Sequence, residues 1–208
     1  MDDRQSGSVW THFDGTILSG PLADTGIALQ IQPMLQTTWS EWQVLHPDTL
    51  VLDLYAQFAN RYRQNYQPGR AGLRPGFQQT VLNWDERLQE SELVLGANLC
   101  GQYRAYVLAD FSGGLSIIND TLDGVPIVIF VDNRSAYALA FQASVNEQHL
   151  IFSVVDGVIV DDAGNAWDIS GMAINGPLAG TNLLFVTSFI TEWYGWAAYH
   201  PDTSIYGR

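Results

Sequence analysis

Hydrophobic and polar positions alternate along several short stretches of the chain, which is the pattern of half-buried strands. Ile27, Leu29 and Ile31 alternate in this way near the start. The clearest stretches lie later, at residues 103–108, 125–131, 136–141 and 150–155. Turn-forming sequences separate them, namely Gly113-Gly114, Asp123-Gly124, Asp132-Asn133 and Asp162-Ala163-Gly164. Short strands at intervals of about ten residues predict a mainly β protein, of the α+β kind with minor helix.

Two short segments carry large apolar residues at every third position instead, which places these residues on one helical face. Those of the first segment are Trp39, Trp42 and Leu45. Those of the second are Trp193, Trp196 and Tyr199. Thr38 precedes the first segment as a candidate N-cap, with Glu41 three residues after it. A His-Pro pair follows each segment and predicts the helix end, because the residue before a proline disfavours helical dihedrals.

The two helical segments belong to one longer motif that occurs twice. It reads Trp39-x-x-Trp42-x-x-x-His46-Pro47-Asp48-Thr49 and Trp193-x-x-Trp196-x-x-x-His200-Pro201-Asp202-Thr203. Upstream, Gly7-x-x-Trp10 and Gly20-Pro21-Leu22-Ala23 parallel Gly164-x-x-Trp167 and Gly176-Pro177-Leu178-Ala179. The offset falls from 157 residues at Trp10 and Trp167 to 154 at Trp39 and Trp193, which small loop deletions explain. The chain therefore contains an internal duplication.

The duplication predicts two related β-rich modules of unequal completeness, each closed by a short tryptophan-faced helix. Residues 1–52 form only the C-terminal half of a first module, residues 53–92 form a connector, and residues 93–208 form a complete second module. Half a β-module leaves strand edges without neighbours, which are costly to bury and adhesive when exposed. We expect the second module, a second copy or a protein partner to supply the missing strands, unless the native start lies upstream of Met1.

The connector differs in charge from the rest of the chain. No acidic residue occurs between residues 54 and 84, and four arginines there give about +4 against about −17 elsewhere. Such a segment is attracted to an acidic protein surface or to anionic lipid headgroups, or it packs on the protein's own acidic surface. The candidate partner-binding residues are Arg61, Tyr62, Arg63, Tyr66, Arg70 and Arg74.

Composition narrows the classes of function. The net charge of −13 argues against nucleic-acid binding, because phosphate recognition needs clustered cations. The chain contains no lysine, so a lysine-containing phosphate loop is excluded. Cys100 is the single cysteine, which excludes an internal disulfide framework and any site built from several cysteines. We expect no cofactor and no metal, and we find neither a transmembrane run nor a signal peptide in the sequence.

Three sets of residues suggest chemistry, and each also has a structural interpretation. The pairs His46 with Asp48 and His200 with Asp202 suit a metal or acid–base site of a hydrolytic enzyme, yet a histidine at a helix end followed by a turn explains them better, because both repeats carry the pair. The paired tryptophans suit a sugar-binding platform, but tryptophans at helical spacing are more often core. The aspartates at 156, 161 and 162 lack the ligand pattern of a calcium loop and indicate a solvated strand and turn.

The chain resembles the domain of unknown function family numbered 3179 over nearly its whole length. The segments Asp3-Arg4-x-x-Gly7-Ser8-x-Trp10 and Gly20-Pro21-Leu22-Ala23 and the first tryptophan motif carry this resemblance, together with Asp85-Glu86-Arg87-Leu88, Val94-Leu95-Gly96, Ile118-Asn119-Asp120-Thr121 and Gly124-Val125-Pro126. The resemblance implies a periplasmic or extracellular location, because relatives commonly carry export signals. It also implies a longer first module in full-length relatives, often with a Tyr-Cys-Pro-x-Cys-Gly turn. The counterpart here, residues 131–136, has no cysteine, and the resemblance implies no reaction.

These observations together favour a non-enzymatic structural or accessory subunit that binds a protein partner in an extracytoplasmic or membrane-associated complex. The half-module, the basic aromatic connector and the missing catalytic motif support this prediction. The alternatives are a metal-binding or hydrolytic enzyme that uses the histidines and aspartates of the repeats, and a carbohydrate-binding module that uses exposed tryptophans.

Overall fold

The computed structural model describes every residue except 35, 54, 62–72, 74–75, 112 and 135–136. Internal contacts divide the chain into two compact units, Met1–Met34 and Leu35–Arg208. The protein is mainly β, so the predicted fold class is confirmed. The module boundaries predicted after residues 52 and 92 stay predictions.

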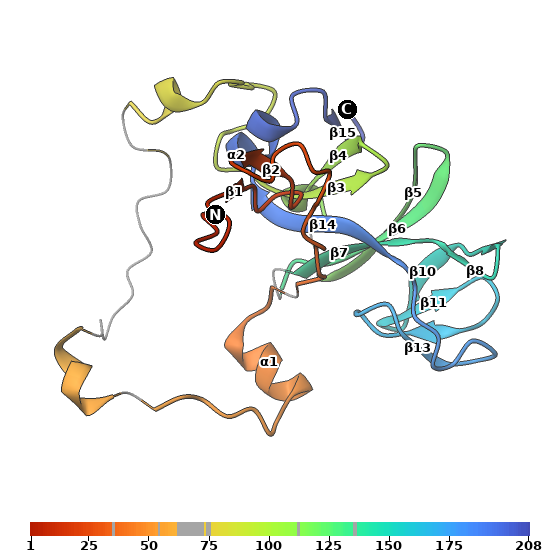
Figure 1. Ribbon diagram of the computed structural model, residues 1–208. Coiled ribbons are helices and arrows are strands. Elements are labelled where there is room, and N and C mark those ends of the chain that lie inside the picture. The colour runs from red at the N-terminus through yellow and green to blue at the C-terminus, as the bar shows by residue number, and fades with distance from the viewer. Residues whose placement is uncertain (35, 54, 62–72, 74–75, 112, 135–136) are drawn as a thin grey trace. The chain divides into compact units, whose positions relative to one another are not determined.

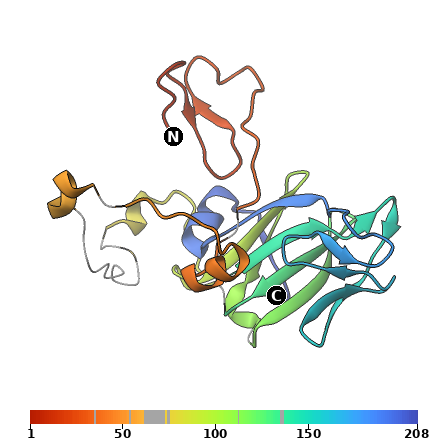
Figure 2. The ribbon, with the colours of Figure 1, turned by 90° about the horizontal axis from the view of Figure 1, so that it is seen from below.

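The first unit is built on a short hairpin. Its strands β1 (Val9–Trp10) and β2 (Ile17–Ser19) pair antiparallel (Figure 2). Ser8 is buried beside β1, and its hydroxyl oxygen accepts the backbone N–H of Leu22 at 3.2 Å. Gly20 has φ +106°, and a Cβ at this position would lie 2.6 Å from the Ser8 Cα. Glycine is therefore required where this turn crosses the strand.

The second unit contains the same arrangement at β12 (Ala166–Trp167) and β13 (Ala173–Asn175). Asn165 takes the place of Ser8, and its side-chain oxygen accepts the N–H of Leu178 at 2.9 Å. Gly176 has φ +95°, and its Cβ would lie 2.6 Å from that same oxygen. The duplication predicted from the sequence is therefore also present in the backbone geometry.

A seven-stranded sheet that curls into a half-barrel dominates the second unit (Figures 1 and 2). All neighbouring strands are antiparallel except β15 and β4. In sheet order the strands are β15 (Ser204–Ile205), β4 (Gln102–Val107), β3 (Leu93–Leu99), β14 (Phe185–Glu192), β7 (Tyr137–Gln142), β6 (Val125–Asp132) and β5 (Leu115–Leu122). The turn predicted at Asp123-Gly124 joins β5 to β6, with φ of 52° and 74°. Positive φ at both residues matches the twist of the strands.

The large sheet packs on both faces, as its strand β6 shows, which lies next to the edge strand β5 and is apolar without alternation. Ile127, Ile129 and Val131 of β6 belong to one buried cluster. Val128 and Phe130 belong to another, on the opposite face. A four-stranded sheet shares this second cluster. Its strands in order are β10 (Phe152–Val155), β11 (Val158–Asp161), β12 and β13.

Asn119 on β5 joins the two sheets. Its side-chain amide donates to the Phe152 carbonyl at 2.8 Å and accepts the Phe152 N–H at 2.8 Å. The Asn119 side chain therefore bonds both backbone groups of Phe152, as the backbone of a neighbouring strand would. A short ribbon of β8 (Ser144–Val145) and β9 (Gln148–His149) connects β7 to β10.

Polar contacts close the half-barrel between β4 and β5, which lie far apart in the strand order. Arg104 on β4 and Asp120 on β5 form an ion pair at 2.6 Å. The Tyr106 hydroxyl donates to the same Asp120 oxygen at 2.7 Å. Arg104 also donates to the Thr121 carbonyl at 3.1 Å and to the Ser204 hydroxyl at 3.0 Å. These bonds hold the two sides of the curled sheet together.

Two buried tyrosines predict a specific alkaline transition. Burial raises the pKa of Tyr106 well above its usual range, and the bond to Asp120 raises it further. Burial and the charge of Asp168 raise the pKa of Tyr137, whose hydroxyl donates to the Ile169 carbonyl. The pKa of an unfolded tyrosine is about 10. Because the folded pKa of each of these tyrosines is higher, the free energy of unfolding is unchanged below about pH 10 and falls as the pH rises above it.

We therefore expect phenolate absorbance in an alkaline titration to show two tyrosines that ionise only as the chain unfolds. Tyr106→Phe and Tyr137→Phe should each remove one of them. Ionisation of all nine tyrosines before any loss of circular dichroism would contradict this.

The α-helices of the described residues are α1 (Trp39–Leu45) and α2 (Trp193–Tyr199). The predicted N-cap of α1 is confirmed, because the Thr38 side-chain oxygen accepts the Glu41 N–H at 3.3 Å. Short 3-10 helices are η1 (Ala56–Arg61), η2 (Gln78–Thr80) and η3 (Leu108–Asp110). Within the described residues, every helix is too short or too polar to cross a bilayer.

The strands predicted at residues 103–108, 125–131, 136–141 and 150–155 correspond to β4, β6, β7 and β10. The strand predicted from Ile27, Leu29 and Ile31 is wrong, because residues 26–34 form no strand. Ile27 and Leu29 are 51% and 43% exposed. Strand formation needs a neighbouring strand for the backbone donors. Here the Leu29 N–H donates to the Gly15 carbonyl at 2.9 Å, whereas the Ile27 N–H donates to a side chain, the Thr25 hydroxyl, at 3.4 Å.

Candidate functional site

The repeated tryptophan motif folds in the same way in both copies. In the first, the Trp42 indole N–H donates to the Thr49 hydroxyl at 2.9 Å. In the second, the Trp196 indole N–H donates to the Thr203 hydroxyl at 2.9 Å. Each bond ties the turn after the helix back to the helix itself. The identical residues of the motif thus specify one local structure, a short helix with a turn folded against it.

The histidine of each motif ends its helix. The backbone N–H of His46 donates to the Trp42 carbonyl at 2.8 Å, and that of His200 donates to the Trp196 carbonyl at 3.0 Å. Each imidazole also lies against the same indole, with ring centroids 4.2 Å apart in the first copy and 4.3 Å in the second. In the second copy, Tyr103 of β4 stacks on His200 at 4.0 Å with 18° between the ring planes.

The second copy is buried against β3 and β4. Trp193 is fully buried and Trp196 is 1% exposed. The Trp196 ring lies directly on the backbone of Gly96 in β3, where a Cβ would come within 2.2 Å of the ring carbon Cε3. Since no side chain fits at that distance, the ring can pack on β3 only where the strand carries a glycine.

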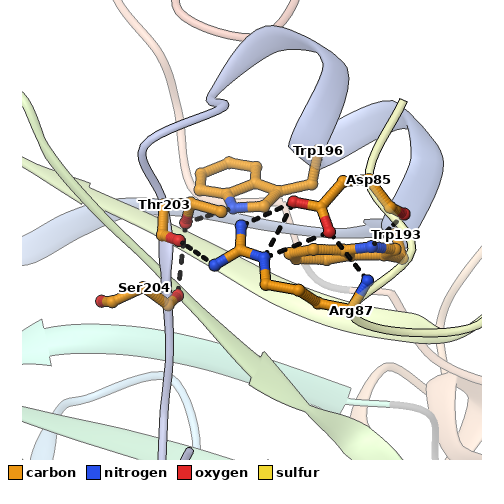
Figure 3. Close-up of polar contacts among 6 residues, drawn as sticks. All are labelled: Asp85, Arg87, Trp193, Trp196, Thr203 and Ser204. Carbon is orange, nitrogen blue, oxygen red and sulfur yellow. Dashed lines mark hydrogen bonds and ion pairs between the residues drawn. The ribbon is translucent and has the colours of Figure 1, made fainter. Parts of the chain in front are cut away.

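A segment that precedes β3 holds α2 in place (Figure 3). The Arg87 guanidinium pairs with the Asp85 carboxylate at 2.7 Å and donates to the Thr203 carbonyl at 2.9 Å. It also lies 5.3 Å from the centroid of the Trp193 ring, within cation–π range. The Trp193 indole N–H donates to the Asp85 backbone carbonyl at 3.1 Å. Asp85 and Arg87 therefore fasten both the helix and the turn that follows it.

The Asp85–Arg87 pair is ionised at neutral pH. The hydrogen bonds that the Arg87 guanidinium donates to the Asp85 carboxylate raise the pKa of Arg87. Partial burial would raise the pKa of Asp85, but its hydrogen bonds from Arg87 outweigh this effect and lower it. A lowered carboxyl pKa stabilises the fold above the unfolded value of about 3.9, and this contribution is lost as the pH falls below it.

The first copy exposes the residues that the second copy buries. No residue of α1 is buried, and Trp39 is 51% exposed. We call residues 39–52 the first-repeat hook, because they comprise α1, its turn and the apolar segment that follows. Six of its large apolar side chains are exposed, by 51% to 95%. They are Trp39, Val44, Leu45, Leu50, Val51 and Leu52.

The residues that suggested metal or acid–base chemistry lie at the helix ends and in the turns that follow them. Asp48 and Asp202 are exposed in the turns after the helices, and His200 is buried among aromatic rings. Across the described part of the chain, no three side chains of histidine, cysteine, aspartate or glutamate gather so that they could hold a metal ion. Cys100 is exposed in the turn between β3 and β4.

The prediction of a solvated turn at the aspartates near residue 160 is wrong for Asp161, which is 5% exposed. Its carboxylate accepts the N–H of Ala163 at 3.0 Å, the N–H of Asn165 at 2.9 Å and the indole N–H of Trp167 at 2.9 Å. These donors satisfy the acceptor oxygens of the buried side chain from within the protein. Asp156 and Asp162 are exposed.

Of the predicted partner-binding residues in the connector, Arg61 alone is described. It is exposed at the end of η1, with its guanidinium carbon 5.3 Å from the Phe58 ring centroid. The other five lie outside the described residues. They are Tyr62, Arg63, Tyr66, Arg70 and Arg74.

Sequence reasoning missed the apolar segment Leu50-Val51-Leu52. A signal was available, because the constant offset of 154 places residues 50 and 51 opposite Ser204 and Ile205, which form β15. It also missed that Gly96 leaves room for the Trp196 ring on β3. A lone glycine inside a strand pattern indicates a bulge as readily as a close ring contact.

Comparison with known proteins agrees with the sequence resemblance. No curated protein and no solved structure matches the chain significantly. The profile of the family described as "Protein of unknown function (DUF3179)" matches residues 1–203. Because this match spans nearly the whole sequence, including both copies of the tryptophan motif, the chain belongs to the DUF3179 family.

Proposed function

We propose that this protein is a non-enzymatic structural or accessory subunit that binds a protein partner through the first-repeat hook. One observation carries the proposal: the same motif, with the same internal hydrogen bonds, is buried in the second copy and exposed in the first. The second copy supports the idea that this motif is a packing element that requires a surface to pack on.

The energetics favour a partner over solvent. Several exposed large apolar side chains within one short segment are typical of interaction surfaces. Complete burial of a large apolar side chain contributes about 1.5–3 kcal/mol, so six of them contribute on the order of 10 kcal/mol. Association itself costs roughly 4–15 kcal/mol. The hook therefore supports a specific complex only where most of the six side chains become buried together.

The setting proposed for this complex is extracytoplasmic or membrane-associated, on the basis of the family resemblance alone. The arginine-rich connector is proposed as a secondary contact with an acidic partner or with anionic headgroups, because its charge is opposite to that of the rest of the chain. Arg61 at the end of η1 is exposed and available for such a contact.

The test is site-specific photocrosslinking in the cell of origin. A crosslinking residue at Val44, which is 77% exposed on α1, should give one discrete protein adduct. The matched control is Val155 at the β10–β11 turn, which is also apolar and 52% exposed, and should give none. Trp39→Ala should weaken the Val44 adduct at least about tenfold, because tryptophans anchor interfaces.

Two outcomes would contradict the proposal. In the first, the purified chain is a stable monomer and Val44 yields no adduct. In the second, Val44 and Val155 yield the same adducts, which would show nonspecific contact.

A further inference from the structure

The second copy shows what kind of surface accepts the tryptophan motif. Three residues form what we call the α2 seat. They are Gly96, whose backbone lies under the Trp196 ring, Tyr103, which stacks on His200, and Arg87, which donates to the Thr203 carbonyl. All three come from residues 87–103, a short segment that leads into one hairpin. The seat is therefore a compact unit of an antiparallel strand pair and the segment before it.

The seat also receives the chain that follows the motif. Ser204 and Ile205 form β15, which adds to the edge strand β4 as a parallel neighbour. Their counterparts in the first copy, Leu50 and Val51, are 95% and 71% exposed. On the other side of the helix, residues 190–192 pair with β3, whereas their counterparts 36–38 form no strand. The backbone on both sides of α1 is thus open to strand addition.

We propose that the first-repeat hook docks on a partner that supplies an antiparallel strand pair of the same chemistry as the α2 seat. The partner places a glycine under Trp42, an aromatic ring against His46 and an arginine at the Thr49 carbonyl. Its edge strand takes Leu50 and Val51 as a parallel neighbour. This inference rests on the proposed protein-binding function and specifies the partner.

The hook does not dock on the α2 seat of its own chain or on that of a second copy. The seat already holds α2, whose Trp193 and Trp196 are at most 1% exposed. α2 follows β14 without a break, and β14 pairs with β3 through six residues, Thr187 to Glu192. The hook would have to displace an element held by all of these contacts, and would leave an equally apolar helix exposed.

Charge and shape specify the partner further. Residues 39–52 contain two acidic side chains, Glu41 and Asp48, and no lysine or arginine, so a partner that presents arginine is complementary. Gln43 stands where the second copy has the fully buried Ala197. The partner's seat is therefore roomier at this point and offers a hydrogen-bonding group to the Gln43 amide.

The experiment builds the seat into the full chain. Residues 85–158 are copied directly in front of Met1, without a linker. Met1 exchanges backbone hydrogen bonds with Trp10 just as Ile159 pairs with Trp167, so Met1 takes the position that follows Val158. The chain also carries Gln43→Ala, because the copied seat has no room for glutamine. Hydrogen exchange of peptide 39–49 should slow at least about hundredfold relative to the parent chain with the same substitution.

The control is a matched pair of glycine substitutions in the extended chain. Valine in place of the copied Gly96 should abolish the protection of residues 39–49 and leave residues 193–203 protected. Gly96→Val in the original module should do the reverse. Both variants add the same valine side chain. A difference between their hydrogen-exchange patterns therefore reports which tryptophan packs on which glycine.

Each other result overturns the inference. Unprotected hook residues beside a folded added segment would show that the seat chemistry is wrong, and so would an added segment that stays unprotected throughout. A dimer of the parent chain with a protected hook would point to a second copy. A Val44 adduct without protection in the extended chain would leave the protein-binding function standing and reject only the proposed partner.

Discussion

Trp196→Ala is expected to destabilise the second unit by about 3–5 kcal/mol, the usual cost of removing a large buried aromatic side chain. The ring fills the space over Gly96 and donates to the Thr203 hydroxyl, so its removal leaves both a cavity and an unpaired acceptor. Since domains of this size are stable by roughly 5–15 kcal/mol, much of the variant should be unfolded at 37 °C if the parent lies at the low end of this range.

Trp42→Ala is the matched control, because it removes the same ring from the same motif 154 residues earlier. It should cost less than about 1 kcal/mol, because α1 has no buried residue and its surroundings lose little on truncation. Urea unfolding followed by far-ultraviolet circular dichroism measures both variants without depending on tryptophan fluorescence. Equal costs at the two positions would show that the chain itself buries α1, and would remove the basis of the proposed function.

The architecture was predictable where local pattern decides it. Alternating strands and Asp-Gly turns identified β4, β6, β7 and β10, and the Thr38 cap identified α1. The strand expected at Ile27, Leu29 and Ile31 failed for a physical reason. Alternation specifies a strand only when a neighbour accepts its hydrogen bonds, and that neighbour is a nonlocal feature which a local pattern does not contain.

The sequence predicted the local fold of both copies of the motif, but not which copy is buried. The repeat located both motifs, because identical tryptophans, histidines and prolines at one spacing specify one local fold. The burial of only one copy depends on β3, β4 and Arg87, which lie about 100 residues from α2 in the sequence. Six identical residues therefore have different surroundings, and the difference marks the first copy as the functional candidate.

For the connector, the sequence predicted the charge but no geometry. Its charge was evident from composition, but all of its predicted binding residues except Arg61 lie outside the described part of the chain. Composition establishes that a segment attracts an opposite charge, and it does not establish a geometry. The hook, by contrast, has both a geometry and an internal example of how it packs, and this is why we propose the function for it.

Arg104→Met is expected to have the second largest effect, a loss of about 2–3 kcal/mol, somewhat below the range for breaking a fully buried ion pair. Arg104 and Asp120 have side chains that are 25% and 14% exposed, and they join β4 to β5 across the half-barrel. Methionine keeps most of the aliphatic volume, so the loss reports the polar contacts. It leaves the Asp120 carboxylate with the Tyr106 hydroxyl and the Thr121 N–H as donors but without a cation.

Arg134→Met is the control for this prediction, because Arg134 also pairs with an aspartate, Asp132, at 3.3 Å but is 73% exposed. Its removal should leave the urea midpoint unchanged, since solvent screens an exposed pair. Adding Asp120→Asn to Arg104→Met should recover part of the lost stability, because the neutral amide no longer needs the cation. If Arg104→Met and Arg134→Met had equal effects, the closure of the half-barrel would depend on its apolar interior, with the ion pair contributing only to the surface.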